Sequence, residues 1–335
     1  MTPTPTSCSI STCSRSASTR SATSSTTDPI GSRSRCAGSR GCSTAELAAV
    51  APRPAAGPFS PPRRGCGRGE TVQDGRTPVQ ETPEGVVRRL SAARAALPRE
   101  HDAVLAFDAD GTLWKGDVGN DLFEALIAAE AVREEARAAL LVEARAACST
   151  EDGSTTTIAR GLFAALAAGT YDEARAFAMM AWVFAGYSLD EARAFARRAI
   201  EARGLEARLH RFLQPILAWA EAENVPVWVV SASPRWIVEM GVAFLGIPAS
   251  RVVAMTPRMQ DGRIKPELDG PPIYGDHKPV SLRDACPGAT LLGAFGDSSY
   301  DVPMLAASRV PVAVRPKAGL LARAAEVPSL VVVGT

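Results

Sequence analysis

Short apolar runs alternate with helical patterns through residues 84–335, and this alternation limits the fold more than any other feature of the chain. The expected strands are 103–107, 225–230, 251–254, 290–295, 310–314 and 330–333. Strands that alternate with helices pair in parallel and are covered on both faces. We therefore predict an α/β fold with a three-layer, Rossmann-like parallel sheet. Residues 255–265 predict a hairpin that turns at Asp261-Gly262.

One long insertion interrupts the alternation between the first and second core strands. Almost all of it has the periodicity of helices, and alanine is frequent there. The insertion is too long to be a loop. We therefore predict an inserted, all-helical cap domain over residues 118–223 and a catalytic core made of 84–117 and 224–335.

The N-terminal quarter, residues 1–83, has a different composition. It is rich in Ser, Thr, Pro, Arg and Gly, and it carries ten arginines against five acidic residues. Such a segment cannot bury enough apolar surface to offset its conformational entropy, so we predict disorder. Two alternatives stay open, an over-extended start of translation and a basic interaction tail.

Charge and hydropathy exclude some classes of partner. The net charge is +1, so no overall field favours nucleic acid. No apolar run is long enough to span a membrane, and the start lacks a secretory signal. No CxxC pair indicates zinc, and the odd count of seven cysteines argues against a disulfide framework. We expect a cytoplasmic protein without nucleic-acid or membrane partners; oligomeric state is not indicated.

Polar side chains that suit phosphate and a hard divalent cation cluster at the ends of predicted strands. They are Asp108 and Asp110 after the first strand, Ser231 after the second, Asp297 and Asp301 after the run 290–295, and Lys278 at a helix start. In an open parallel sheet the carboxyl ends of the strands form the ligand site. Carboxylate oxygens are the ligands that Mg²⁺ prefers.

Four sequence motifs contain these residues. They are FDADGTLW (107–114), VVSASP (229–234), DHKP (276–279) and GDSSYDVPML (296–305). In this order they resemble the four motifs of the haloacid dehalogenase superfamily, and they look most like its phosphoserine-phosphatase-like branch with a helical cap. The resemblance covers residues 104–333 and leaves the N-terminal quarter unexplained.

The resemblance implies a role for each motif residue. Asp108 would be the nucleophile that forms an aspartyl-phosphate, and Asp110 would act as general acid and base. Mg²⁺ would be held by carboxylates of Asp108 and Asp297 and by the backbone carbonyl of Asp110. Asp301 would bind the metal through water or orient Lys278.

The phosphate and the substrate have candidate residues as well. Thr112, Ser231 and Lys278 would bind the phosphoryl group. Asp117 could meet a substrate ammonium, and Arg160 a substrate carboxylate. Simpler roles compete for five of the candidates: helix capping for Ser231, Asp117 and Asp301, and a solvated surface charge for Lys278 and Arg160.

The predicted function is Mg²⁺-dependent hydrolysis of a phosphomonoester on a small phosphorylated metabolite, with phosphoserine as a candidate. An acid at position 110 argues against a transport ATPase, which carries Thr there, and against a dehalogenase, which needs no acid there. Three alternatives remain: a phosphocholine or phosphoethanolamine phosphatase, a phosphotransferase, and a non-catalytic binding protein.

Overall fold

The computed structural model describes residues 78–98 and 101–334. Within these ranges seven strands form one parallel sheet in the order β1-β9-β8-β7-β2-β3-β4. They are β1 (Val79–Gln80), β9 (Val331–Val333), β8 (Val310–Val314), β7 (Thr290–Gly296), β2 (Ala103–Phe107), β3 (Val227–Pro234) and β4 (Val252–Met255). The predicted Rossmann-like parallel sheet is confirmed.

Two hydrophobic clusters show that both faces of the sheet are covered. Alternate residues of a strand point to opposite faces, and in β2 Leu105 and Phe107 join one cluster whereas Ala106 joins the other. The first face packs against α1 (Pro83–Ala95) and α9 (Arg235–Ala243), and α8 (Gln214–Ala222) packs on α1. The second packs against α10 (His277–Ala285), α11 (Val302–Ala306) and α12 (Ala318–Ala322).

Three neighbouring strands each place a small side chain in the second cluster: Ala106, Ala294 and Ala313. These alanines leave room for larger side chains of the covering helices, which are Leu282, Met304, Leu305 and Leu320. Close packing of this kind requires strand and helix side chains of complementary volume. The sheet therefore has helices on both faces, as the three-layer prediction requires.

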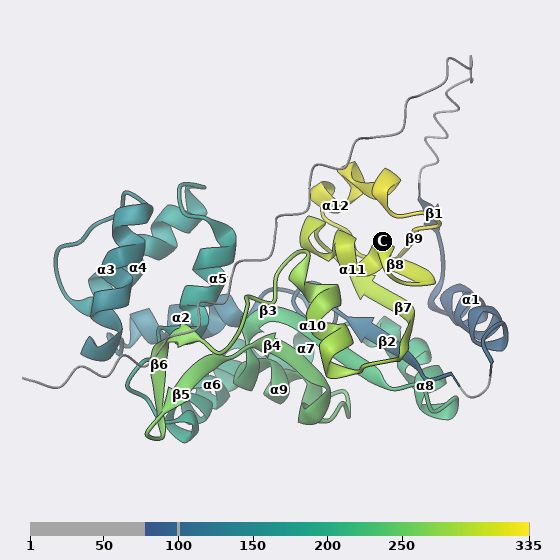
Figure 1. Ribbon diagram of the computed structural model, residues 1–335, viewed down its shortest axis with the longest axis horizontal. Helices are drawn as coiled ribbons and strands as arrows, with labels where there is room; N and C mark the ends of the chain where they lie inside the picture. Colours follow the sequence, from purple (N-terminus) through teal and green to yellow (C-terminus); the bar gives the residue numbers. More distant parts are fainter. Residues whose placement is uncertain (1–77, 99–100, 335) are drawn as a thin grey trace, which may run out of the picture. The chain divides into compact units, whose positions relative to one another are not determined.

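The segment between β2 and β3 is helical, as predicted. Its helices are α2 (Val118–Ala128), α3 (Arg137–Ala146), α4 (Thr155–Ala167), α5 (Glu173–Trp182), α6 (Leu189–Arg203) and α7 (Leu205–Arg208), followed by α8. Helices α3, α4 and α5 lie together at the left of Figure 1. Whether this segment acts as a cap domain stays a prediction.

The hairpin of β5 (Pro257–Gln260) and β6 (Arg263–Leu268) connects the core to the helical segment. Asp261 and Gly262 both have positive φ, as the predicted two-residue turn requires. The Gly186 amide donates to the Ile264 carbonyl at 2.9 Å, and the Ile264 amide donates to the Tyr187 carbonyl at 2.8 Å. These two backbone bonds join the hairpin to the end of the loop after α5.

The predicted boundary of the N-terminal extension differs from the structure. Residues 78–83, assigned above to the disordered extension, are part of the fold, because β1 pairs with β9 and Thr82 caps α1. The remainder of that extension, residues 1–77, lies outside the described residues. Helix α2 is capped by Asp117 and α6 by Ser188. In the described part of the chain, no helix has both the length and the apolarity needed to cross a membrane.

Candidate active site

Three neighbouring strands carry the candidate residues to one edge of the sheet. β7, β2 and β3 are adjacent, so Asp297 after β7 and Asp108 after β2 leave the sheet side by side. The Asp108 amide donates to the Phe295 carbonyl at 2.8 Å, which continues the pairing of the two strands. β3 is longer than predicted, and Ser231 therefore lies inside the strand rather than after it. Lys278 is in the first turn of α10.

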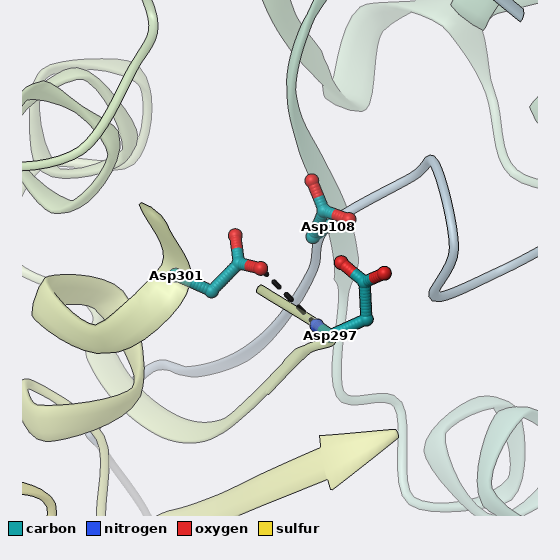
Figure 2. Close-up of side chains that lie close together, drawn as sticks. All are labelled: Asp108, Asp297 and Asp301. Carbon is teal, nitrogen blue, oxygen red and sulfur yellow. Dashed lines mark hydrogen bonds between the residues drawn. The ribbon is translucent and has the colours of Figure 1, made fainter. Parts of the chain in front are cut away.

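The carboxylates of Asp108, Asp297 and Asp301 form a buried acidic cluster (Figure 2). One oxygen from each residue lies within 4.8 Å of the others. Asp301 is fixed by its neighbours, because its Oδ2 accepts from the Asp297 amide at 3.1 Å and from the Ser298 amide and hydroxyl at 2.9 Å. Asp301 thus closes the capping box of its own turn with Ser298, although its side chain makes no capping bond to α11, and its other oxygen faces the cluster.

Lys278 is the buried cation of the cluster. Its Nζ donates to Asp108 Oδ1 and to Asp301 Oδ1, both at 2.6 Å, and only 3% of its side chain is exposed. Burial alone would lower the pKa of Lys278, but the charges of Asp108 and Asp301 outweigh burial and raise it. Lys278 is therefore charged and is not a surface lysine.

The cluster holds more negative charge than its lysine can balance. Burial raises the pKa of Asp108 well above its ordinary value, and repulsion from Asp301 adds to this effect, although Lys278 opposes it. Burial likewise raises the pKa of Asp297 to about 6, with Lys317 opposing the rise. A divalent cation would relieve this repulsion, and three oxygen ligands of this kind suit Mg²⁺.

Two glycines let the backbone approach the cluster closely. A Cβ on Gly111, which has a φ of +86°, would lie 2.0 Å from Asp297 Oδ2. A Cβ on Gly296 would lie 2.4 Å from the Cβ of Asp301. Any larger residue at either position would push a carboxylate out of the cluster, so the site needs both glycines.

Asp110 is not part of the acidic cluster through its side chain. Its Oδ1 accepts from the Trp114 indole and the Val118 amide, both at 2.8 Å. Its Oδ2 accepts from the Ser233 hydroxyl at 2.7 Å and the Ser231 hydroxyl at 3.4 Å. These four donors hold the carboxylate in one orientation at the wall of the site.

Asp110 and the cluster share a small cavity of about 80 Å³. Its lining residues are Asp108, Asp110, Asp117, Phe177, Ala232, Ser233, Tyr274, Lys278, Asp297, Ser298, Tyr300 and Lys317.

The predicted phosphate residues Thr112 and Ser231 are fully buried behind the residues that form the wall of this cavity. Thr112 Oγ1 donates to Asp108 Oδ2 at 2.9 Å, and Ser231 Oγ accepts from the Ser233 amide at 3.1 Å. Both support residues of the wall instead of lining it.

Of the two predicted substrate residues, Asp117 lines the cavity and Arg160 does not. Asp117 lines the cavity and also caps α2, because its Oδ1 accepts from the Asn120 amide at 2.7 Å. Burial and the charge of Asp110 raise the pKa of Asp117 to about 7. Arg160 does not line the cavity; it binds the Ile127 carbonyl at 3.0 Å and pairs with Glu130. The structure therefore gives Arg160 the simpler role of a helix-surface ion pair.

Sequence reasoning missed Lys317, Ser233 and three aromatic residues. Lys317 Nζ lies 2.9 Å from Asp297 Oδ2. It follows β8 at the same sheet edge, and that position was a usable signal. Ser233 lies two residues after Ser231 in the same motif. The rings of Phe177, Tyr274 and Tyr300 come from separate segments, and nothing in the sequence brings them together.

The fold and the site together define an α/β enzyme with an acidic, lysine-balanced centre at the carboxyl edge of a parallel sheet. Residues 105–306, more than half of the chain, match the haloacid dehalogenase-like hydrolase family. The chain belongs to this family, which confirms the predicted superfamily. It is an enzyme of the hydrolase class, and the non-catalytic alternative loses its basis.

Comparison with individual proteins gives a partial sequence match to one protein and a similar fold in two others. Over 84 residues the chain is 38% identical to the phosphoserine phosphatase of Halobacterium salinarum (strain ATCC 29341 / DSM 671 / R1), a match that covers 24% of this chain and 37% of that protein. A protein of unknown function from Bordetella pertussis Tohama I has a similar structure, with a TM-score of 0.55, 19% identity, and coverage of 70% of this chain and 99% of that one. A functionally unknown protein from Anaerococcus prevotii DSM 20548 gives a TM-score of 0.53, 12% identity, and coverage of 71% and 87%.

Proposed function

We propose that this protein is a Mg²⁺-dependent phosphomonoester hydrolase that acts on a small phosphorylated metabolite through an aspartyl-phosphate on Asp108. The observation that carries the proposal is the buried cluster of Asp108, Asp297 and Asp301 around Lys278. Mg²⁺ bound there would offset the negative charge of both the nucleophile and the phosphate ester. Asp108 and Asp297 would supply carboxylate ligands, with Asp301 as a further ligand directly or through water.

Two hydrogen bonds to the carboxylate support Asp108 as the group that would attack phosphorus. Thr112 and Lys278 hold its two oxygens at 2.9 Å and 2.6 Å, so the carboxylate is oriented before substrate arrives. The bond that forms is Asp108 Oδ–P, and the bond that breaks is the one from phosphorus to the ester oxygen. Lys278 stays within reach of the transferring phosphoryl oxygens and stabilises their charge.

Asp110 would supply and remove the proton. In its protonated form it would give a proton to the departing alkoxide, and as a carboxylate it would take a proton from the water that cleaves the aspartyl-phosphate. Ser233 and Trp114 hold the two oxygens of Asp110, so the group faces the cavity during both steps. We propose Ser233 as the hydroxyl that faces the phosphoryl group, because Ser233 lines the cavity whereas Ser231 is buried behind its wall.

The cavity favours an ester whose leaving group carries an amine. Asp117 supplies a carboxylate, and the rings of Phe177, Tyr274 and Tyr300 form one wall, with centroids 5.7 Å and 4.5 Å apart along the row. Aromatic faces and a carboxylate together attract an ammonium group. Phosphoserine fits this requirement, and phosphoethanolamine or phosphocholine is the second candidate because the wall is aromatic.

A panel of phosphate esters tests the function. Purified protein is assayed for phosphate release from phosphoserine, phosphoethanolamine, phosphocholine and neutral sugar phosphates, with Mg²⁺ or with a chelator. We expect Mg²⁺-dependent turnover that favours the amine esters, and its loss in Asp108→Asn. Asp117→Asn should reduce the preference for amines while sparing neutral esters. Turnover retained by Asp108→Asn would refute the nucleophile, and a preference for sugar phosphates would refute the substrate class.

A further inference from the structure

Two lysines reach the acidic cluster, and their surroundings differ sharply. Lys278 is buried and is shared between two carboxylates that are themselves buried. Lys317 makes one ion pair, with Asp297, and 66% of its side chain is exposed whereas only 4% of the Asp297 side chain is. A lysine with a largely exposed side chain keeps most of its hydration and can leave its partner at small cost.

The chain fixes the backbone of Lys317 next to Asp297. The Lys317 amide donates to the Asp297 carbonyl at 2.8 Å, just beyond the end of β8. The long side chain then carries the ammonium back to Asp297 Oδ2 at 2.9 Å. The same oxygen faces the backbone of Gly111, where a Cβ would lie 2.0 Å away, so it belongs to the tightest part of the site. Lys317 therefore neutralises Asp297 from a position that lines the cavity.

We propose that Lys317 is an exchangeable counter-ion of the metal site. Its ammonium neutralises Asp297 while no divalent cation is bound and moves into solvent when the cation takes its place. The inference rests on the magnesium site of the proposed function. A single ammonium and a doubly charged cation cannot both lie against one carboxylate oxygen without strong repulsion. Lys317 therefore competes with the metal and lowers its apparent affinity, whereas Lys278 does not exchange.

Direct metal binding tests this role. Mg²⁺ affinity is measured by titration calorimetry on the whole protein, without substrate, for Lys317→Met, Lys317→Arg and the unmodified chain. Lys265→Met is the matched control, because it removes one lysine charge on the β5–β6 hairpin, away from the cavity lining. We expect Lys317→Met to bind Mg²⁺ about threefold to tenfold more tightly. Lys317→Arg and Lys265→Met should stay within about twofold of the unmodified protein.

The thermal unfolding temperature, measured with a chelator and with Mg²⁺, is a second test of the counter-ion role. Lys317→Met should unfold at a lower temperature than the unmodified protein without metal, and saturating Mg²⁺ should remove most of that difference. Unchanged or weaker Mg²⁺ binding by Lys317→Met would overturn the exchange role. If the unmodified protein binds no Mg²⁺ at all, the metal site of the proposed function fails as well. Asp297→Asn, which should abolish binding, shows that the titration reports this site.

Discussion

Asp117 carries a half-buried carboxyl group whose electrostatic cost can be measured. Its carboxylate caps α2 through the Asn120 amide and lines the cavity beside Asp110. The substitution Asp117→Asn removes the charge but keeps a side-chain oxygen that can accept the same capping bond, because Asn and Asp are comparable N-caps. The variant therefore isolates the electrostatic contribution of this group to the free energy of unfolding.

The size of the effect follows from the pKa of Asp117. Burial, followed by repulsion from Asp110, raises it from 3.8 to about 7. At about 1.4 kcal/mol for each tenfold change in proton affinity, this corresponds to at most roughly 4 kcal/mol. Because the side chain is partly accessible, about 2 kcal/mol is a more realistic figure.

The pH dependence has a definite sign. Between pH 3.8 and about 7 the folded state binds more protons at Asp117 than the unfolded state. The contribution of this group to stability is therefore greatest below pH 3.8 and is lost as the pH rises through about 7. In Asp117→Asn that loss is absent, so the variant should be more stable than the parent, by a margin that grows with pH.

Urea unfolding in a chelator, at about pH 5 and about pH 8, measures this margin. Asp117→Asn should gain about 1 kcal/mol more over the parent at the higher pH than at the lower. Asp172→Asn is the control, because Asp172 caps α5 in the same way but is exposed. A margin that does not change with pH, or a destabilised variant, would show that Asp117 is not held at an electrostatic cost.

Three further substitutions probe the supports of the site. Lys278→Met leaves two buried carboxylates without their cation, so it should destabilise the metal-free protein by about 3–5 kcal/mol in urea unfolding. A decrease in the free energy of unfolding below about 1 kcal/mol would contradict the pairing of Lys278 with these carboxylates. Gly111→Ala forces a methyl group against Asp297 and should weaken Mg²⁺ binding in calorimetry, whereas unchanged affinity would refute the close approach. Ser233→Ala removes the 2.7 Å bond to Asp110 and should lower kcat about tenfold with little change in KM; the reverse pattern would assign Ser233 to ground-state binding instead.

Much of the core fold could be predicted because parallel strands are buried on both faces and appear as uninterrupted apolar runs. β2 and β8 match the predicted ranges, and the hairpin turn matches at both of its residues. β1 could not be predicted, since two residues carry no periodicity and their order depends on pairing with β9, some 250 residues away.

The candidate site was predictable where it depends on strand ends and less so where it depends on packing. Asp108, Asp297 and Asp301 meet because β2 and β7 are neighbours. Arg160 was a candidate only because it lies in the predicted cap, and its pairing with Glu130 could not be predicted from the sequence. Lys317 was overlooked because its position after β8 is a weak signal: a lysine after a strand is usually a solvated surface charge.

Trapping the covalent intermediate tests the central claim most directly. The protein would be mixed with a phosphate ester and Mg²⁺, quenched in acid during turnover, and digested for tandem mass spectrometry. We predict a phosphoryl group on the side chain of Asp108, absent when Mg²⁺ is chelated and absent in Asp108→Asn. Phosphate release with no phosphorylated Asp108 under the same quench, or phosphorylation of a different residue, would contradict the account.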